Sequence, residues 1–106
     1  MDITFSLLNK TRSALRTIYG ERLDKIILYG SYARGEQTPE SDIDLLIVLN
    51  DPQLDTGKEI RLINNFIYPL SIQYNIDISA HPVTQKKFLK GAGFFLKLVK
   101  KEGKEL

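Results

Sequence analysis

The sequence has no cysteine and no tryptophan, and its 106 residues include one methionine and one histidine. Without cysteine, disulfide bonds and thiolate metal sites are excluded. No apolar run approaches the roughly 20 residues that a helix needs to cross a bilayer. The N-terminus lacks the basic start, long apolar stretch and small-residue cleavage site of a signal peptide. We therefore expect a cytoplasmic protein without a membrane segment, folded as one domain over residues 1–106.

Charge is unevenly distributed along the chain. The formal net charge is +2, but residues 86–106 hold seven lysines against two glutamates, and the other 85 residues carry a net charge of −3. A basic segment can bind nucleic acid or an acidic partner. Here the lysines alternate with apolar residues at helical spacing, which favours a solvated helix face. Direct nucleic-acid binding is therefore the less favoured interpretation.

The spacing of apolar residues predicts an α/β fold with a small mixed β-sheet and flanking helices. The elements follow in the order helix, strand, strand, helix, strand and helical C-terminus, over residues 2–19, 25–29, 42–49, 56–68, 73–79 and 84 onwards. A short helical turn is expected over 31–35, and the C-terminal helix is expected to break near Gly91 and Gly93.

The fourth of these elements has a clear predicted end. Pro69 should terminate the helix that starts at Thr56, because a proline inside a helix removes a backbone donor and clashes with the preceding turn. The residues expected on the buried stripe of this helix are Ile60, Ile63, Phe66 and Ile67.

Two aspartates open the most apolar predicted strand. Asp42 and Asp44 are two residues apart, so their side chains point to the same face of the strand, about 7 Å apart. A carboxylate pair at the end of a buried strand is costly unless it meets cations or solvent. Carboxylate oxygens suit Mg²⁺, but an Asp-x-Asp pair alone is equally consistent with a capping or solvent-facing role.

A glycine and a serine follow the preceding predicted strand. Gly30 allows backbone amides to approach a phosphate closely, and Ser31 adds a hydroxyl donor at the start of a helical turn. Gly-Ser alone is an ordinary turn. Combined with the aspartates, which follow after ten intervening residues, it would let one element hold a triphosphate while the next binds the metal that neutralises it.

At this point the sequence resembles a known family. The run GSYARGEQTPESDIDLLIVL, Gly30 to Leu49, is similar to the signature of the DNA polymerase beta-type nucleotidyltransferase superfamily. Its form and the short chain most resemble the minimal nucleotidyltransferases (MNT), which are often the antitoxins of toxin–antitoxin systems with a HEPN-domain partner. The closing FLKLVKKEGKEL also resembles the end of this family, where a helix precedes a Glu-Gly pair.

The resemblance implies a role for particular residues. Gly30 and Ser31 would bind the phosphates of ATP, and Asp42 and Asp44 would bind Mg²⁺, as two ions. The family's third carboxylate corresponds to Asp77, which would complete the metal site and act as the base for the attacking hydroxyl. Arg34 is expected either to contact phosphate or to hold the loop through Glu36 or Glu40.

Three further residues are expected to have structural and not catalytic roles. Ser41 is expected to cap the turn before the second strand, and His81 to be a surface or packing residue. Tyr32 is expected to pack, although its position would also allow stacking on a base.

The resemblance also implies a reaction, transfer of AMP from Mg-ATP to a hydroxyl of a protein partner, a HEPN ribonuclease toxin. Alternatives that remain open are nucleotidyl transfer to a small molecule such as an aminoglycoside, a non-catalytic antitoxin that acts by binding alone, and a nucleic-acid-binding module that uses the lysine-rich tail.

Overall fold

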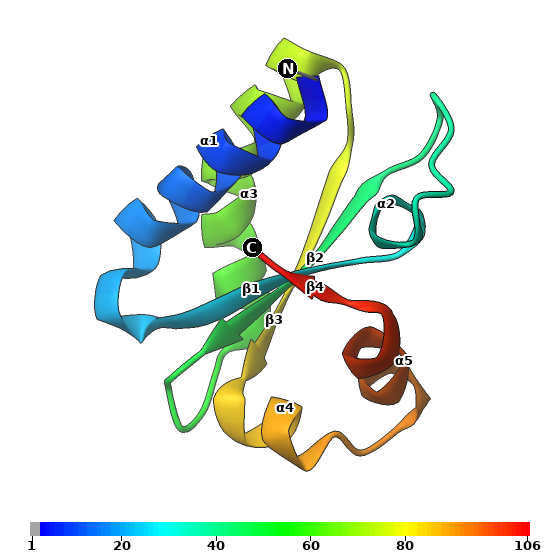
Figure 1. Cartoon of the computed structure of the whole chain (residues 1–106). Coiled ribbons are helices and arrows are strands. Elements are labelled where there is room, and N and C mark those ends of the chain that lie inside the picture. Colours follow the sequence, from blue (N-terminus) through cyan, green and yellow to red (C-terminus); the bar gives the residue numbers. More distant parts are fainter. Residues whose placement is uncertain (1–2) are drawn as a thin grey trace.

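A computed structural model describes residues 3–106, so the predicted helix start at Asp2 lies outside the described residues. Four strands form one sheet at the centre, and helices lie on both of its faces (Figure 1). The helical segments are α1 (Ile3–Tyr19), the 3₁₀ turn η1 (Gly20–Arg22), α2 (Ser31–Arg34), α3 (Thr56–Tyr74), α4 (Gln85–Lys90) and α5 (Phe94–Glu102). The strands are β1 (Leu23–Tyr29), β2 (Ile43–Leu49), β3 (Ile78–Thr84) and β4 (Lys104–Glu105).

The sheet is mixed, in the order β3-β2-β1-β4. β1 is antiparallel to β2 and to β4, whereas β2 and β3 are parallel and joined through α3. This confirms the predicted fold class. No helix in residues 3–106 is long and apolar enough to span a membrane.

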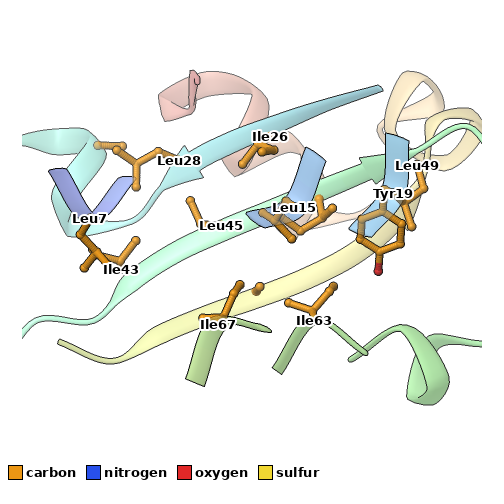
Figure 2. Close-up of a cluster of buried hydrophobic side chains, with 13 residues drawn as sticks. Leu7, Leu15, Tyr19, Ile26, Leu28, Ile43, Leu45, Leu49, Ile63 and Ile67 are labelled. Carbon is orange, nitrogen blue, oxygen red and sulfur yellow. The ribbon is translucent and has the colours of Figure 1, made fainter. Parts of the chain in front are cut away.

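Two apolar clusters cover the two faces of the sheet. Side chains of α1 and α3 pack on one face against alternate residues of β1 and β2, as Figure 2 shows for Leu15, Ile63 and Leu45. On the other face, Phe88 of α4 and Val99 of α5 pack against Leu46 and Val48. Because both faces are covered, nearly all of β2 is buried, as its continuous apolar run predicts.

The predicted end of the third helix was wrong. α3 continues through Pro69 to Tyr74, and Asn75, which caps its C-terminal end, adopts the left-handed conformation with φ 54°. Pro69 is exposed, whereas Leu70 and Tyr74, beyond it, pack against the buried cluster. This packing offsets the backbone hydrogen bond that the proline removes.

The buried stripe of α3 was predicted correctly at Ile63 and Ile67 and incorrectly at Phe66. The side chain of Phe66 is 45% exposed, while Glu59, one turn before Ile63, is buried. The face toward the sheet therefore follows residues four apart from Glu59 onward, and Phe66 lies one position to the side of it.

The third strand was also placed too early. β3 begins at Ile78 and pairs in parallel with β2 from Ile43–Ile78 to Leu49–Thr84. β3 is an edge strand, which lets it include Pro82, a residue that the sequence pattern excluded. The short β4 was not predicted, because two exposed residues carry no strand pattern.

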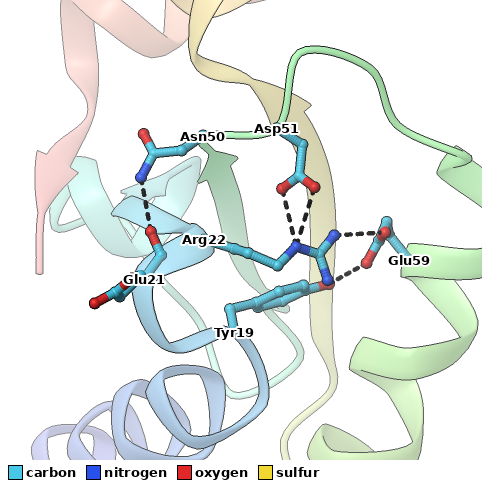
Figure 3. Close-up of polar contacts among 6 residues, drawn as sticks. All are labelled: Tyr19, Glu21, Arg22, Asn50, Asp51 and Glu59. Atoms are coloured by element: carbon cyan, nitrogen blue, oxygen red, sulfur yellow. Dashed lines mark hydrogen bonds and ion pairs between the residues drawn. The ribbon is translucent and has the colours of Figure 1, made fainter.

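A polar network joins three segments at the end of the sheet where α1 meets β1. The Arg22 guanidinium donates to Asp51 at 3.0 Å and to Glu59 at 2.9 Å, and the Tyr19 hydroxyl donates to Glu59 at 3.1 Å (Figure 3). Burial, together with Glu59, raises the pKa of Tyr19. The buried Glu59 carboxylate is thereby paired and hydrogen-bonded, as a buried charge must be.

Candidate active site

The chain turns sharply at Gly30, where β1 ends and α2 begins. Gly30 has φ 77° and ψ −157°, a conformation that side-chain-bearing residues rarely adopt. Its carbonyl accepts from the amides of Ala33 at 3.1 Å and Arg34 at 3.2 Å, which closes the helical turn expected over 31–35. The first amides of a helical turn have no partner within it and point outward, so the amide of Ser31 is placed to meet an anion.

Asp44 lies directly against this turn. It is the register partner of Tyr29 in the β1–β2 pair, and a Cβ atom at Gly30 would fall 2.3 Å from Asp44 Oδ2. The structure therefore brings the predicted phosphate-binding glycine and one predicted metal ligand into direct contact. Only a residue without a side chain fits between them.

The half-buried Asp44 carboxylate lies in an unfavourable place for a negative charge. Burial raises the pKa of Asp44, and the charge of nearby Asp42 raises it further. Asp42 itself is exposed and immediately precedes β2. A divalent cation would relieve both effects, and the oxygen donors of the two carboxylates fit Mg²⁺ in their chemistry.

Asp77 precedes β3 and is exposed. Its carbonyl accepts from the amide of Ile43 at 2.9 Å, and Ile43 pairs in register with Ile78. Asp42 and Asp77 thus stand side by side in the backbone, at the entry to adjacent parallel strands, and line one groove. Ile78, which follows Asp77, is partly buried and packs against the core cluster.

The three aspartates do not converge on one point. Within residues 3–106, no three histidine, cysteine, aspartate or glutamate side chains form a group that could hold a metal ion. Asp44 contacts the turn at Gly30, whereas Asp42 and Asp77 line the groove beside it. The joint metal-binding role of Asp42, Asp44 and Asp77 therefore stays a prediction.

Arg34 is held by two carboxylates. Its Nε donates to Glu36 Oε1 at 2.6 Å, which is the loop contact that the sequence predicted as one alternative. Its Nη1 donates to both oxygens of Glu102, at 3.2 and 3.0 Å. The amide of Gly30 donates to Glu102 Oε1 at 3.1 Å.

Sequence reasoning assigned no role to Glu102. Glu102 belongs to the Glu-Gly pair that resembles the end of the family and is one of the two acids in residues 86–106. It ends α5, 72 positions after Gly30, and its side chain is only 12% exposed. The Glu-Gly pair was the one signal in the sequence that pointed to it.

Ser41, Tyr32 and His81, which were expected to have structural roles, lie near the site or the core. Ser41 Oγ accepts from the amide of Thr38 at 2.8 Å, which confirms that it caps this turn. Tyr32 packs against the core cluster. His81 is exposed and meets the ring of Phe95 edge-on, with 6.2 Å between centroids, which agrees with a surface or packing residue.

Comparison with known proteins gives a consistent result. A family profile described as "Nucleotidyltransferase domain" matches residues 8–104. The chain is 37% identical over 84 residues to "Putative protein adenylyltransferase MJ0141" of Methanocaldococcus jannaschii, which covers 79% of this chain and 81% of the relative. It is 39% identical over 75 residues to MJ0604, a relative of the same description and organism, covering 71% and 72% of the two chains.

Solved structures with the same fold include toxin–antitoxin complexes. A crystal structure described as a toxin-antitoxin with AMP-PNP superposes with a TM-score of 0.65 and 28% identity, covering 92% of this chain and 69% of the other. A mutant of the toxin-antitoxin MntA-HpeT gives a TM-score of 0.63 and 29% identity, covering 93% and 70%. These matches agree with the family that the sequence resemblance indicated from the run Gly30 to Leu49.

Proposed function

Since the chain belongs to the nucleotidyltransferase domain family, we propose that it transfers AMP from Mg-ATP to a hydroxyl of a protein partner. The observation that carries the proposal is the contact between the turn at Gly30 and Asp44. A phosphate-binding turn and a carboxylate that can hold a metal are useful together only if they act on the same ligand, a nucleoside triphosphate.

In this proposal the residues have distinct tasks. Gly30 and Ser31 bind the phosphates through the turn, and Arg34 presents a fixed positive charge beside them. Asp42, Asp44 and Asp77 would together hold Mg²⁺, and the bound ion would neutralise charge on the triphosphate. The acceptor oxygen attacks the α-phosphorus, its proton passes to Asp77, and the bond to pyrophosphate breaks.

The proposed acceptor is a protein toxin. The relatives named above are described as protein adenylyltransferases, and two similar structures are toxin–antitoxin complexes. We propose that the chain, as a single domain over residues 1–106, acts as a cytoplasmic antitoxin that adds AMP to a HEPN-type ribonuclease partner. Modification of a hydroxyl-bearing side chain would inactivate that partner.

The proposal is tested by mixing the purified chain, labelled ATP, Mg²⁺ and the protein encoded by the adjacent gene. We expect label on the partner, and we expect EDTA or Asp44→Asn to abolish the transfer. Glu21→Gln is the matched control, because it removes a carboxylate from η1 at the far end of β1 and should leave transfer unchanged.

Three outcomes would contradict the proposal in different ways. Persistent transfer by Asp44→Asn would show that the metal assignment is wrong. A wild-type chain that binds and silences the partner without labelling it would show a binding-only antitoxin. Label on an aminoglycoside in place of the protein would identify a small-molecule acceptor.

A further inference from the structure

One carboxylate at the end of α5 contacts both parts of the proposed phosphate site. Glu102 accepts from the amide of Gly30 at 3.1 Å and from Arg34 Nη1 at 3.0 and 3.2 Å. Hydrogen bonds to an ionised group are shorter and stronger than neutral ones, and a two-oxygen contact also fixes direction. Arg34 holds the pKa of Glu102 below its usual range, and the amide of Gly30 contributes in the same sense.

The other partner of Arg34 cannot fix its position equally well. Glu36 is 66% exposed, and ion pairs between exposed side chains contribute little because water screens them and the side chains lose entropy. Glu102 is 12% exposed and belongs to a packed helix. The contacts of Arg34 in the described chain use Nε and Nη1, and a guanidinium has five donor hydrogens, so part of it remains available to a phosphate.

The backbone around Glu102 is itself held against β1. A Cβ atom at Gly103 would lie 2.5 Å from Ile27 Cγ2 and 2.5 Å from the carbonyl oxygen of Val99, so the chain passes β1 at close range. The next residues pair with β1 as β4, with Lys104 opposite Leu28. The strand that leads to Gly30 therefore also fixes the segment that carries Glu102.

From these contacts we infer that Glu102 is a positioning residue for nucleotide binding, which orients the Gly30 peptide and the Arg34 guanidinium toward the phosphates. The inference rests on the proposed function for the identity of the ligand. A site whose donors are held in place before binding loses less entropy when the ligand arrives. The C-terminal segment of the chain is then part of the nucleotide site, although it does not touch the reacting atoms.

The test measures binding of Mg-AMP-PNP by titration calorimetry to the full chain and its variants. We expect Glu102→Ala to raise Kd about tenfold, a change of about 1.4 kcal/mol. Glu102→Gln keeps a carbonyl acceptor for Gly30 but loses the charge, so it should give a smaller rise. Glu105→Gln, an exposed acid three residues later in β4, is the matched control and should bind as wild type does.

Two further measurements separate positioning from loss of the fold. In ¹H–¹⁵N spectra, Glu102→Gln should shift the Gly30 amide while the amides of α1 stay in place. In an Arg34→Ala background, Glu102→Ala should cost less affinity than it does alone, because one of its two effects has already been removed.

The outcomes also separate this inference from the proposed function. Unchanged AMP-PNP affinity in folded Glu102→Ala, or an equal loss in Glu105→Gln, would overturn the inference. If the wild-type chain binds AMP-PNP in a Glu102-dependent way but transfers nothing from ATP, the proposed reaction fails and the positioning role is supported.

Discussion

Gly30 must be glycine for two separate reasons. Its φ of 77° disfavours any side chain, and a Cβ atom would meet Asp44 Oδ2 at 2.3 Å. Gly35 shares only the first requirement, since its φ is 71° and nothing lies within 4 Å of a Cβ there. A comparison of alanine variants at Gly30 and Gly35 therefore distinguishes the cost of backbone strain from the cost of the contact with Asp44.

We expect Gly30→Ala to abolish nucleotidyl transfer and to lower the free energy of unfolding by about 2–3 kcal/mol, because Asp44 must move. Gly35→Ala should cost about 1 kcal/mol and keep most of the transfer activity. Chemical denaturation and the labelled-ATP assay measure both quantities. Equal losses in the two variants would show that the contact with Asp44 is unimportant.

Replacing Asp44 should increase the stability of the protein while it removes the activity. Its raised pKa means that the ionised form is disfavoured in the fold, so ionisation of Asp44 destabilises the protein. We expect Asp44→Asn to abolish transfer and to leave the free energy of unfolding slightly higher than in wild type at neutral pH, a known trade-off at functional sites.

The pH dependence of that gain follows from the direction of the shift. Below the ordinary aspartate pKa of about 3.9, Asp44 is protonated in both the folded and the unfolded chain, so the advantage of asparagine should vanish there. The advantage should grow as the pH rises from the ordinary aspartate pKa to the raised pKa of Asp44, and it should stay constant above that. Urea denaturation at several pH values measures it, and a gain that is largest at low pH would contradict this account.

At the scale of elements, the junction between α5 and β4 depends on one close approach. Gly103 has φ −69°, which any residue can adopt, so its requirement is steric and not conformational. A Cβ atom there would meet Ile27 and the carbonyl of Val99 at 2.5 Å. Gly57 in the first turn of α3 meets nothing closer than 3.5 Å.

Alanine at these two glycines should therefore have opposite effects. We expect Gly103→Ala to reduce the free energy of unfolding by about 1–3 kcal/mol and to weaken AMP-PNP binding, because Glu102 is displaced. Gly57→Ala should be neutral or stabilising by up to about 1 kcal/mol, since alanine favours helix. Thermal unfolding of the two variants decides the matter, and a Gly103→Ala chain as stable as wild type would contradict the packing argument.

The length of α3 also depends on its packing against other elements. Local rules favour an end at Pro69, but Leu70 and Tyr74 reach the core only if the helix continues. Full burial of an apolar side chain contributes about 1.5–3 kcal/mol, and the two partly buried side chains together can offset much of the cost of about 3 kcal/mol for a proline in a helix interior. Contacts with distant residues therefore outweigh the local signal.

At the scale of the whole molecule, Glu59 joins segments that are far apart in the chain. Its carboxylate receives hydrogen bonds from Tyr19 at the end of α1 and from Arg22 in η1, and Arg22 also binds Asp51 (Figure 3). The network lies where α1, the β2–α3 connection and α3 meet. Its loss should loosen the packing of α1 against α3 without touching the active site.

We expect Glu59→Ala to lower the free energy of unfolding by about 2–3 kcal/mol, because it leaves a buried hydroxyl without its acceptor and empties the space of the side chain. Tyr19→Phe should cost about 1 kcal/mol, and the double variant should cost less than the sum. AMP-PNP affinity should be unchanged in all three folded variants. If the losses of the two single variants simply added up in the double variant, Tyr19 and Glu59 would not interact, which would contradict this account.

Much of the fold and half of the candidate site follow from short stretches of sequence. The continuous apolar run of β2, the glycine and serine after β1 and the aspartate pair are local patterns, and each has a direct physical meaning. A buried strand needs apolar residues on both faces, a sharp turn needs glycine, and a divalent cation needs oxygen ligands. These patterns were sufficient to place Gly30, Ser31, Asp42 and Asp44 and to predict the fold class.

The tertiary structure alone decided the start of β3, the end of α3, the exposure of Phe66 and the contacts of Glu102. Each depends on which distant segment lies opposite: β2 sets the register of β3, the core sets the length of α3, and β1 holds the segment that carries Glu102. Pairing and burial are contacts between residues far apart in sequence, and no local pattern encodes the partner. For that reason the sequence by itself could predict the turn at Gly30 but not the contacts that Glu102 makes with Gly30 and Arg34.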